Sequence, residues 1–295
     1  MQRQEKLEYD DMETIFDEEY IRKHFDDGTY GIVELAILKS LYKYVFLDKK
    51  TLSEAVNGIL KPKLQKPDYS RNINNLIGIA ISKIEYSDPG AGKKVAEITV
   101  YHLTTPAHDF IKGKYPKYKH YMRKKKQALT MYDQSYIKER LLVNRWHLYM
   151  LTQYRCKKDI YCGKKTFTAG TISVPSYVHI VDEYGKLIVI AVAYPREGKD
   201  FSYREKIFYN KVREIRRVTT YSVSEKILLV ILCHSTHDID AAAGLLDYIG
   251  QGIVYVTEPD IVKDQGLQRA FDCTQREDGS IEKKFLSVSL RKSEI

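Results

Sequence analysis

Apolar residues recur at helical spacing in three consecutive stretches between Ile32 and Ile84. The first, Ile32–Leu47, is densely apolar and long enough for a buried helix. The second opens with Thr51-Leu52-Ser53-Glu54, the pattern of a capping box, and ends at Lys61-Pro62. Its apolar stripe is Leu52, Ala55, Val56, Ile59 and Leu60. The third starts near Ser70, with the stripe Ile73, Leu76, Ile77, Ala80, Ile81 and Ile84. The pattern predicts three helices in a row.

A β-hairpin is predicted directly after these helices. Ile84–Tyr86 and Val95–Tyr101 alternate as strands do, and the turn-forming segment Ser87–Gly92 separates them. The run Tyr101–Ile111 then carries an aromatic-x-Leu-Thr stretch and a short helix ending in large apolar residues. This run and the order of elements resemble the winged-helix domains of many bacterial proteins. The resemblance implies that duplex DNA is a partner.

The polar side of the third predicted helix offers candidate DNA-binding residues. Arg71, Asn74 and Asn75 can bond base edges, and the small residues Gly78 and Ser82 would let the helix enter a major groove. Lys93 and Lys94 lie at the hairpin tip, where a wing meets phosphates. The alternative is an ordinary amphipathic helix with a solvated outer face.

Charge is unevenly distributed along this chain of net charge +9. Residues 1–29 form an acidic lead-in with a short helix expected near Asp17–Phe25, and residues 30–112 form the winged helix. Residues 113–131 form a linker rich in lysine and tyrosine. Such a segment can follow a nucleic-acid backbone and stack on bases, or it can simply be solvated. Its candidate phosphate-binding residues are Lys114, Lys117, Lys119, Arg123, Lys124, Lys125 and Lys126.

The second half, residues 132–295, changes from one long helix to short strands. The helix is expected over Tyr132–Tyr154, with Trp146 in the core. Strands are predicted at Tyr177–Val181, Leu187–Ala193, Ile227–Cys233 and Ile253–Thr257, and helices at Phe201–Val218 and Ala241–Ile249. The fold class is therefore α+β, with a mixed sheet and helices packed on it.

This order of elements resembles the restriction-endonuclease-like fold and, for the whole chain, the replication-relaxation family of Gram-positive plasmids and conjugative elements. The resemblance depends on Asn144-Arg145, on Val174-Pro175-Ser176 and on the strand Leu187–Ala193 followed by a basic helix. It implies a role in plasmid replication or conjugative transfer, with a relaxase or replication initiator as a further partner.

The nuclease chemistry departs from that pattern. Related nucleases place an Asp after the proline and an acidic residue at the end of the next strand, where the carboxylates hold Mg²⁺. Here Ser176 follows Pro175, and the strand ends without a carboxylate. We therefore expect a catalytically inactive binding domain. The alternatives are a Mg²⁺-dependent nuclease with displaced ligands (Asp182 or Glu183, with Glu197 and Lys199) and a transcription regulator with a C-terminal sensor domain.

Other chemistry is not expected. The segment Cys233–Asp238 gathers Cys and His, but no second pair completes a four-ligand zinc site, which favours a strand end and a helix N-cap at Asp238. The four scattered cysteines indicate reduced thiols in a cytoplasmic protein. The sequence has no secretion signal at its start, no membrane span and no Gly-rich nucleotide loop. We expect no metal or cofactor, and monomer and homodimer stay as alternatives.

Overall fold

The computed structural model describes residues 16–61, 67–88, 96–116, 134–154, 156–182, 185–196, 200–220, 226–249 and 252–286. The chain divides into two compact units, Met1–Tyr132 and Asp133–Ile295. Helices combine with a mixed sheet, so the α+β class is confirmed. Within the ranges given above, no helix is both long and apolar enough to cross a membrane.

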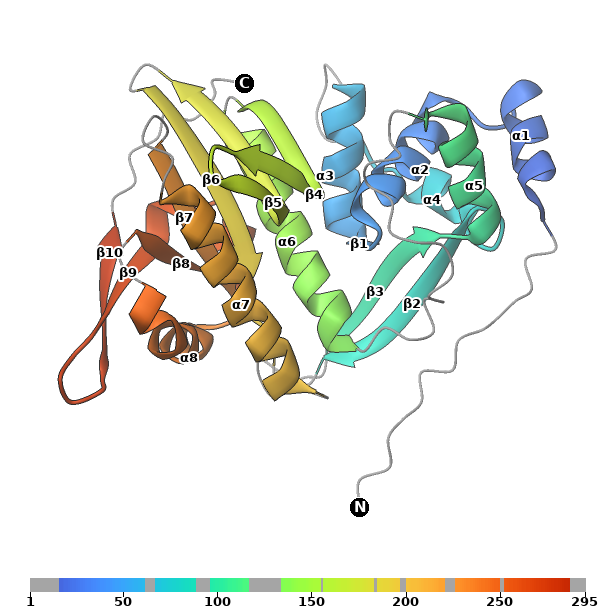
Figure 1. Cartoon of the computed structure of the whole chain (residues 1–295). Helices are drawn as coiled ribbons and strands as arrows, with labels where there is room; N and C mark the ends of the chain where they lie inside the picture. The colour runs from blue at the N-terminus through green and yellow to red at the C-terminus, as the bar shows by residue number, and fades with distance from the viewer. Residues whose placement is uncertain are drawn as a thin grey trace. The chain divides into compact units, whose positions relative to one another are not determined.

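The first unit contains the three predicted helices and the predicted strand pair (Figure 1). Its elements are α1 (Glu18–Asp26), α2 (Ile32–Tyr44), β1 (Leu47–Asp48), α3 (Lys49–Leu60), α4 (Ser70–Leu76), β2 (Ile81–Asp88), β3 (Ala96–Leu103) and α5 (Thr105–Lys114). The strands form an antiparallel sheet in the order β1-β3-β2. The short helix expected near Asp17–Phe25 is α1, and Asp17 caps it.

The start of α3 corrects one prediction. Asp48 is the N-cap, and its carboxylate accepts a hydrogen bond of 2.9 Å from the Thr51 backbone N–H and one of 2.8 Å from the Thr51 hydroxyl. The capping box predicted at Thr51 is therefore wrong, because the helix begins at Lys49 and Asp48 caps it by accepting the Thr51 N–H. Ile59 is 46% exposed and does not belong to the buried stripe.

The third helix is shorter than its apolar pattern predicts. It ends at Leu76, and Gly78 adopts a φ of +80°, a left-handed conformation that favours glycine. Ile81 then pairs with Leu103 across the sheet. Gly78 and Ser82, expected on the polar side of the helix, instead lie in the turn and in β2. The apolar stripe is buried as predicted except at Ile77, which is half-buried, and α4, the following turn and β2 share it.

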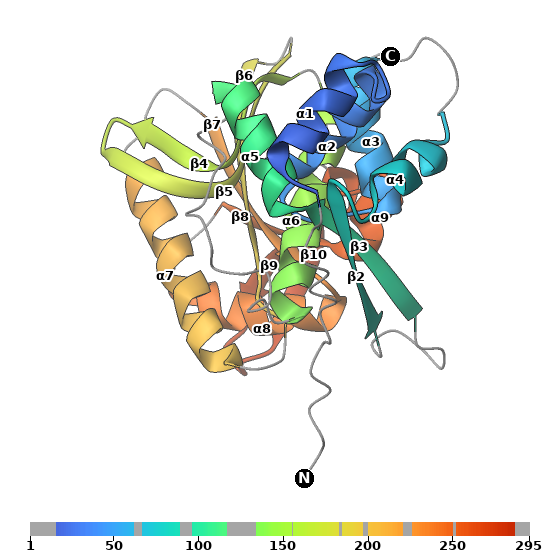
Figure 2. The same cartoon turned by 90° about the vertical axis from the view of Figure 1, so that its right-hand side faces the viewer.

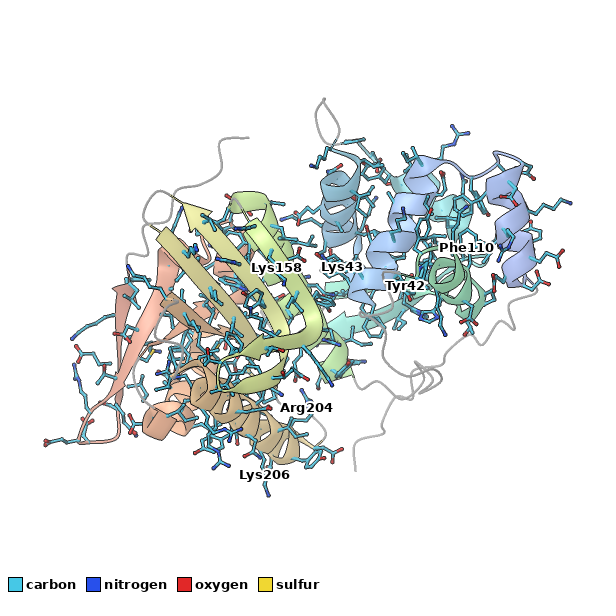
Figure 3. All side chains as sticks on the ribbon, turned by 45° about the horizontal axis from the view of Figure 1, so that its top comes forward. Tyr42, Lys43, Phe110, Lys158, Arg204 and Lys206 are labelled. Atoms are coloured by element: carbon cyan, nitrogen blue, oxygen red, sulfur yellow. The ribbon has the colours of Figure 1, made fainter. Side chains whose placement is uncertain are left out.

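The last helix of the first unit, α5, packs against α1 and α2. Thr104 caps α5 through the Ala107 N–H, and its hydroxyl and backbone N–H also bond the carbonyls of Ile79 and Ala80. Phe110 of α5 stacks on Phe25 of α1, with ring centroids 5.2 Å apart (Phe110 is labelled in Figure 3). These contacts connect segments that the chain places far apart.

The second unit is built on a seven-stranded sheet in the order β10-β9-β8-β7-β6-β5-β4. Its elements are α6 (Gln134–Gln153), β4 (Cys156–Phe167), β5 (Gly170–Asp182), β6 (Gly185–Ala193), α7 (Phe201–Thr219), β7 (Lys226–Cys233), α8 (Thr236–Leu246), β8 (Ile253–Thr257), α9 (Glu258–Val262), β9 (Ala270–Gln275) and β10 (Ile281–Leu286). Strands β6, β7 and β8 run parallel, and the remaining neighbours are antiparallel.

Helices cover both faces of this sheet. Figure 2 shows α7 on one side and α6 on the other. Residues Ile188, Ile190 and Val192 of β6 pack in one core with apolar side chains of α7 and α8. Trp146 of α6 is fully buried, as the sequence predicts.

Several features of this unit differ from the sequence prediction: α8 spans Thr236–Leu246 rather than Ala241–Ile249, and α9 was not predicted. Cys156 and Cys162 lie on β4, an edge strand so rich in lysine that it lacks a strong apolar pattern; charged residues are typical of sheet edges. Strands β9 and β10 are equally polar. Ser235, not Asp238, is the N-cap of α8, and Asp238 completes the reciprocal pair as the third helical residue.

Candidate functional site

The outer side of α4 is the strongest candidate for a binding surface. Arg71, Asn74 and Asn75 are all exposed, and their spacing of three and four residues places them on one side of the helix. Ile73 and Leu76 point into the core on the opposite side. No hydrogen bond or ion pair to another described residue engages the three polar side chains. They are therefore available to a ligand.

Two hydrogen bonds hold α4 in place from its flanks. The Tyr69 hydroxyl donates to Asn57 Oδ1 of α3 at 2.7 Å. The Asn72 amide donates to Glu34 Oε1 of α2, while Glu34 Oε2 accepts the Gly31 backbone N–H at 2.9 Å. A short helix gains little rigidity of its own, so these contacts fix the direction in which its outer side faces. The sequence reasoning found the exposed residues but missed Glu34 and Asn72.

The other predicted DNA-binding residues are only partly placed. Lys114 is exposed at the end of α5, with its ammonium 5.3 Å from the Phe110 ring centroid and 5.7 Å from that of Phe25. Its charge is held near the α1–α5 contact and lies on a different helix from Arg71. The rest lie outside the described residues: Lys93, Lys94, Lys117, Lys119, Arg123, Lys124, Lys125 and Lys126.

A second polar cluster lies beneath α6, around Ser176 of β5, the residue that follows Pro175. Ser176 is fully buried beside Ala191 of β6. His147 of α6, also fully buried, contacts the Ser176 hydroxyl through Nδ1 at 2.9 Å and Asp159 of β4 through Nε2 at 3.1 Å. The carboxylate can only accept, so Nε2 carries a proton. This network joins α6, β4 and β5 through polar side chains.

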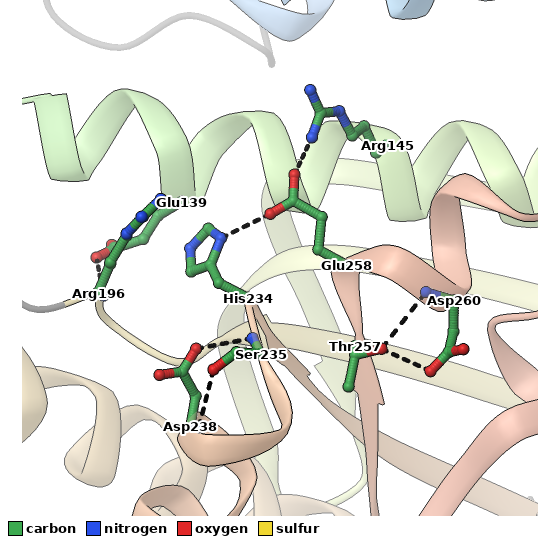
Figure 4. Close-up of polar contacts among 9 residues, drawn as sticks. All are labelled: Glu139, Arg145, Arg196, His234, Ser235, Asp238, Thr257, Glu258 and Asp260. Atoms are coloured by element: carbon green, nitrogen blue, oxygen red, sulfur yellow. Dashed lines mark hydrogen bonds and ion pairs between the residues drawn. The ribbon is translucent and has the colours of Figure 1, made fainter. Parts of the chain in front are cut away.

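Ion pairs line the carboxyl ends of the parallel strands (Figure 4). Glu258, directly after β8, accepts hydrogen bonds from Arg145 of α6 and from His234 Nδ1, the latter at 2.8 Å. Glu139 of α6 pairs with Arg204 of α7 and accepts the Arg196 backbone N–H at 3.2 Å. This edge is where α/β sheets commonly bind ligands. Here its carboxylates are paired with cations from neighbouring elements.

Among the described residues of this edge, Tyr194 and Cys233 have strongly raised pKa values. Burial raises the pKa of Tyr194, and the hydrogen bond to Glu205 raises it further, so the phenol stays protonated. Among the described residues, no three His, Cys, Asp or Glu side chains gather closely enough to hold a metal ion. The displaced nuclease ligands considered from the sequence are not described: Glu183, Glu197 and Lys199 lie outside the ranges, and the same holds for the Asp182 side chain.

Comparison of the chain with known proteins gives no further information about these sites. At a significant level, it matches no family model, no curated protein and no solved structure.

Proposed function

We propose that residues 30–112 are a winged-helix domain that binds duplex DNA, with α4 in the major groove. The observation that carries this proposal is the arrangement α2-β1-α3-α4-β2-β3, in which β1 pairs with β3 and α4 presents an unengaged polar side. Arg71 would bond guanine, and Asn74 and Asn75 adenine, because these side chains match the donors and acceptors of those base edges.

The remaining cations would bind the phosphate backbone. Lys93 and Lys94 would contact it from the wing, and Lys114 with the basic linker would extend that contact. The second unit would be a restriction-endonuclease-like domain without nuclease activity, since the position of one metal ligand holds Ser176 bonded to His147. By its resemblance to the replication-relaxation family, the protein would act in plasmid replication or conjugative transfer, together with a relaxase or replication initiator.

Fluorescence anisotropy tests the role of α4. A duplex selected from a random pool and an unrelated duplex are titrated with the wild-type protein, with Arg71→Ala/Asn75→Ala and with the control Arg22→Ala, which removes one exposed charge from α1. Each lost base contact should cost about 1–3 kcal/mol, or roughly five- to 150-fold in affinity, for the selected duplex alone. Unchanged discrimination in the double variant would exclude the assignment. Gels of the same samples with Mg²⁺ report any cleavage.

A further inference from the structure

The outer side of α7 in the second unit is cationic and partly apolar. The exposed residues of this helix are Ser202, Tyr203, Lys206, Ile207, Asn210, Arg213 and Arg217. Tyr203 is 67% exposed and Ile207 49%, which is unusual for such large apolar side chains one helical turn apart. No acidic residue of α7 is exposed: Glu205 and Glu214 are half-buried.

The three exposed cations of this side are not neutralised. Neither Lys206 nor Arg213 nor Arg217 forms an ion pair or hydrogen bond with another described residue. In contrast, Lys211 pairs with Glu214 at 2.7 Å and Arg204 with Glu139. Figure 3 shows Lys206 on the side of α7 that points away from the sheet. The paired cations of α7, Arg204 and Lys211, are thus distinct from the three exposed cations, which have no ion-pair partner among the described residues.

The spacing of the unpaired cations suits a linear polyanion. Positions 206, 213 and 217 are seven and four residues apart, so they follow one side of the helix. Eleven residues of α-helix extend about 16 Å, and one DNA strand carries a phosphate every 3.4 Å or so along its axis. The row can therefore reach several phosphates, and Tyr203 and Ile207 can pack against sugars beside them.

We propose that this side of α7, defined by Tyr203, Lys206, Ile207, Arg213 and Arg217, binds the phosphate backbone of duplex DNA without sequence preference. The inference rests on the proposed function, because it gives the second unit a contact with the same DNA that α4 reads. It adds a binding surface on a different unit and a different helix.

The test compares two triple variants of the full chain. Lys206→Gln/Arg213→Gln/Arg217→Gln removes the row, and Lys158→Gln/Lys186→Gln/Lys263→Gln removes three scattered exposed lysines from the same unit. Dissociation constants for the selected and unrelated duplexes are measured across a salt series. Each lost phosphate contact lowers the magnitude of the logarithmic salt slope by about 0.9. The α7 variant should thus lose two to three units of slope equally for both duplexes, and the scattered variant less than one.

The outcomes separate this inference from the proposed function. If the two triple variants have equal salt slopes while the wild-type protein discriminates between the duplexes, the α7 surface is overturned and base reading by α4 is retained. Loss of slope only in the α7 variant, with a wild-type protein that binds both duplexes equally, would support α7 and refute reading by α4. A wild-type protein that binds no duplex would overturn both. Circular dichroism of the two variants verifies that they are folded.

Discussion

Replacing Ser176 by alanine tests the buried network beneath α6. Asp159 holds the proton on His147 Nε2, so in the neutral imidazole the Ser176 hydroxyl donates to Nδ1. Ser176→Ala removes the hydroxyl that donates to the buried Nδ1 atom. Both residues are fully buried, so bulk water does not reach the vacated position.

The expected cost follows from this burial. An ordinary hydrogen bond contributes about 1 kcal/mol to the free energy of unfolding, whereas a buried group left unsatisfied costs about 1–3 kcal/mol. Ser176→Ala should therefore lower the free energy of unfolding by about 1–3 kcal/mol. Ser173→Ala, on the exposed side of the same strand, should change it by less than about 0.5 kcal/mol.

Trp146 provides the assay. It is the only tryptophan of the chain, is fully buried and directly precedes His147, so its fluorescence during a urea titration reports on this unit. In a His147→Phe background no ring nitrogen remains, and Ser176→Ala should then cost much less than it does in the wild type. An equal cost of Ser176→Ala in both backgrounds would show that the two side chains are not coupled and would refute the reasoning.

Two further predictions concern titratable groups. Burial lowers the pKa of His102 in the folded protein below 6.5, so on acidification the unfolded chain takes up a proton at this side chain first. The contribution of His102 to the free energy of unfolding is therefore complete above pH 6.5. It falls as the pH drops toward the lower folded pKa, by at most about 1.4 kcal/mol per pH unit. Urea titrations followed by circular dichroism at pH 7 and pH 5 should show a smaller loss in His102→Phe; equal losses would contradict the prediction. Burial also raises the pKa of Cys156 and of Cys273 to about 12, so at pH 8 only about one thiol in 10⁴ is ionised. Mass spectrometry should find both unmodified by iodoacetamide in the native protein and alkylated in urea, and rapid native modification of either would argue against that burial.

Only those features of the candidate site that depend on neighbouring residues could be predicted from the sequence. Arg71, Asn74 and Asn75 could be selected because the apolar residues Ile73 and Leu76 mark the opposite side of the helix. The unpaired row on α7 was visible only as a basic helix. The pairing of Lys211 with Glu214 follows from their spacing, but the pairing of Arg204 with Glu139 of another helix could not be known from spacing.

The sequence by itself determined where most helices and strands lie, since hydrophobic periodicity and capping are properties of neighbouring residues. Strand β8 was placed to the residue, and α6 and β7 within two residues at each end. The edge strands β4 and β10 were not predicted because a strand at a sheet edge buries less apolar surface and carries a weaker pattern; β9, next to β10, has a similarly polar sequence.

Only the tertiary structure decided which side chains meet. Asn72 bonds Glu34 across 38 positions, His147 bonds Ser176 across 29, and Arg145 bonds Glu258 across 113. It also divided the stripe Ile73–Ile84 between α4 and β2, because pairing with β3 satisfies the backbone from Ile81 onward. Hydrophobic periodicity indicates whether a side chain is buried. The residue that it contacts is decided by the packing of helices and strands that are far apart in the sequence.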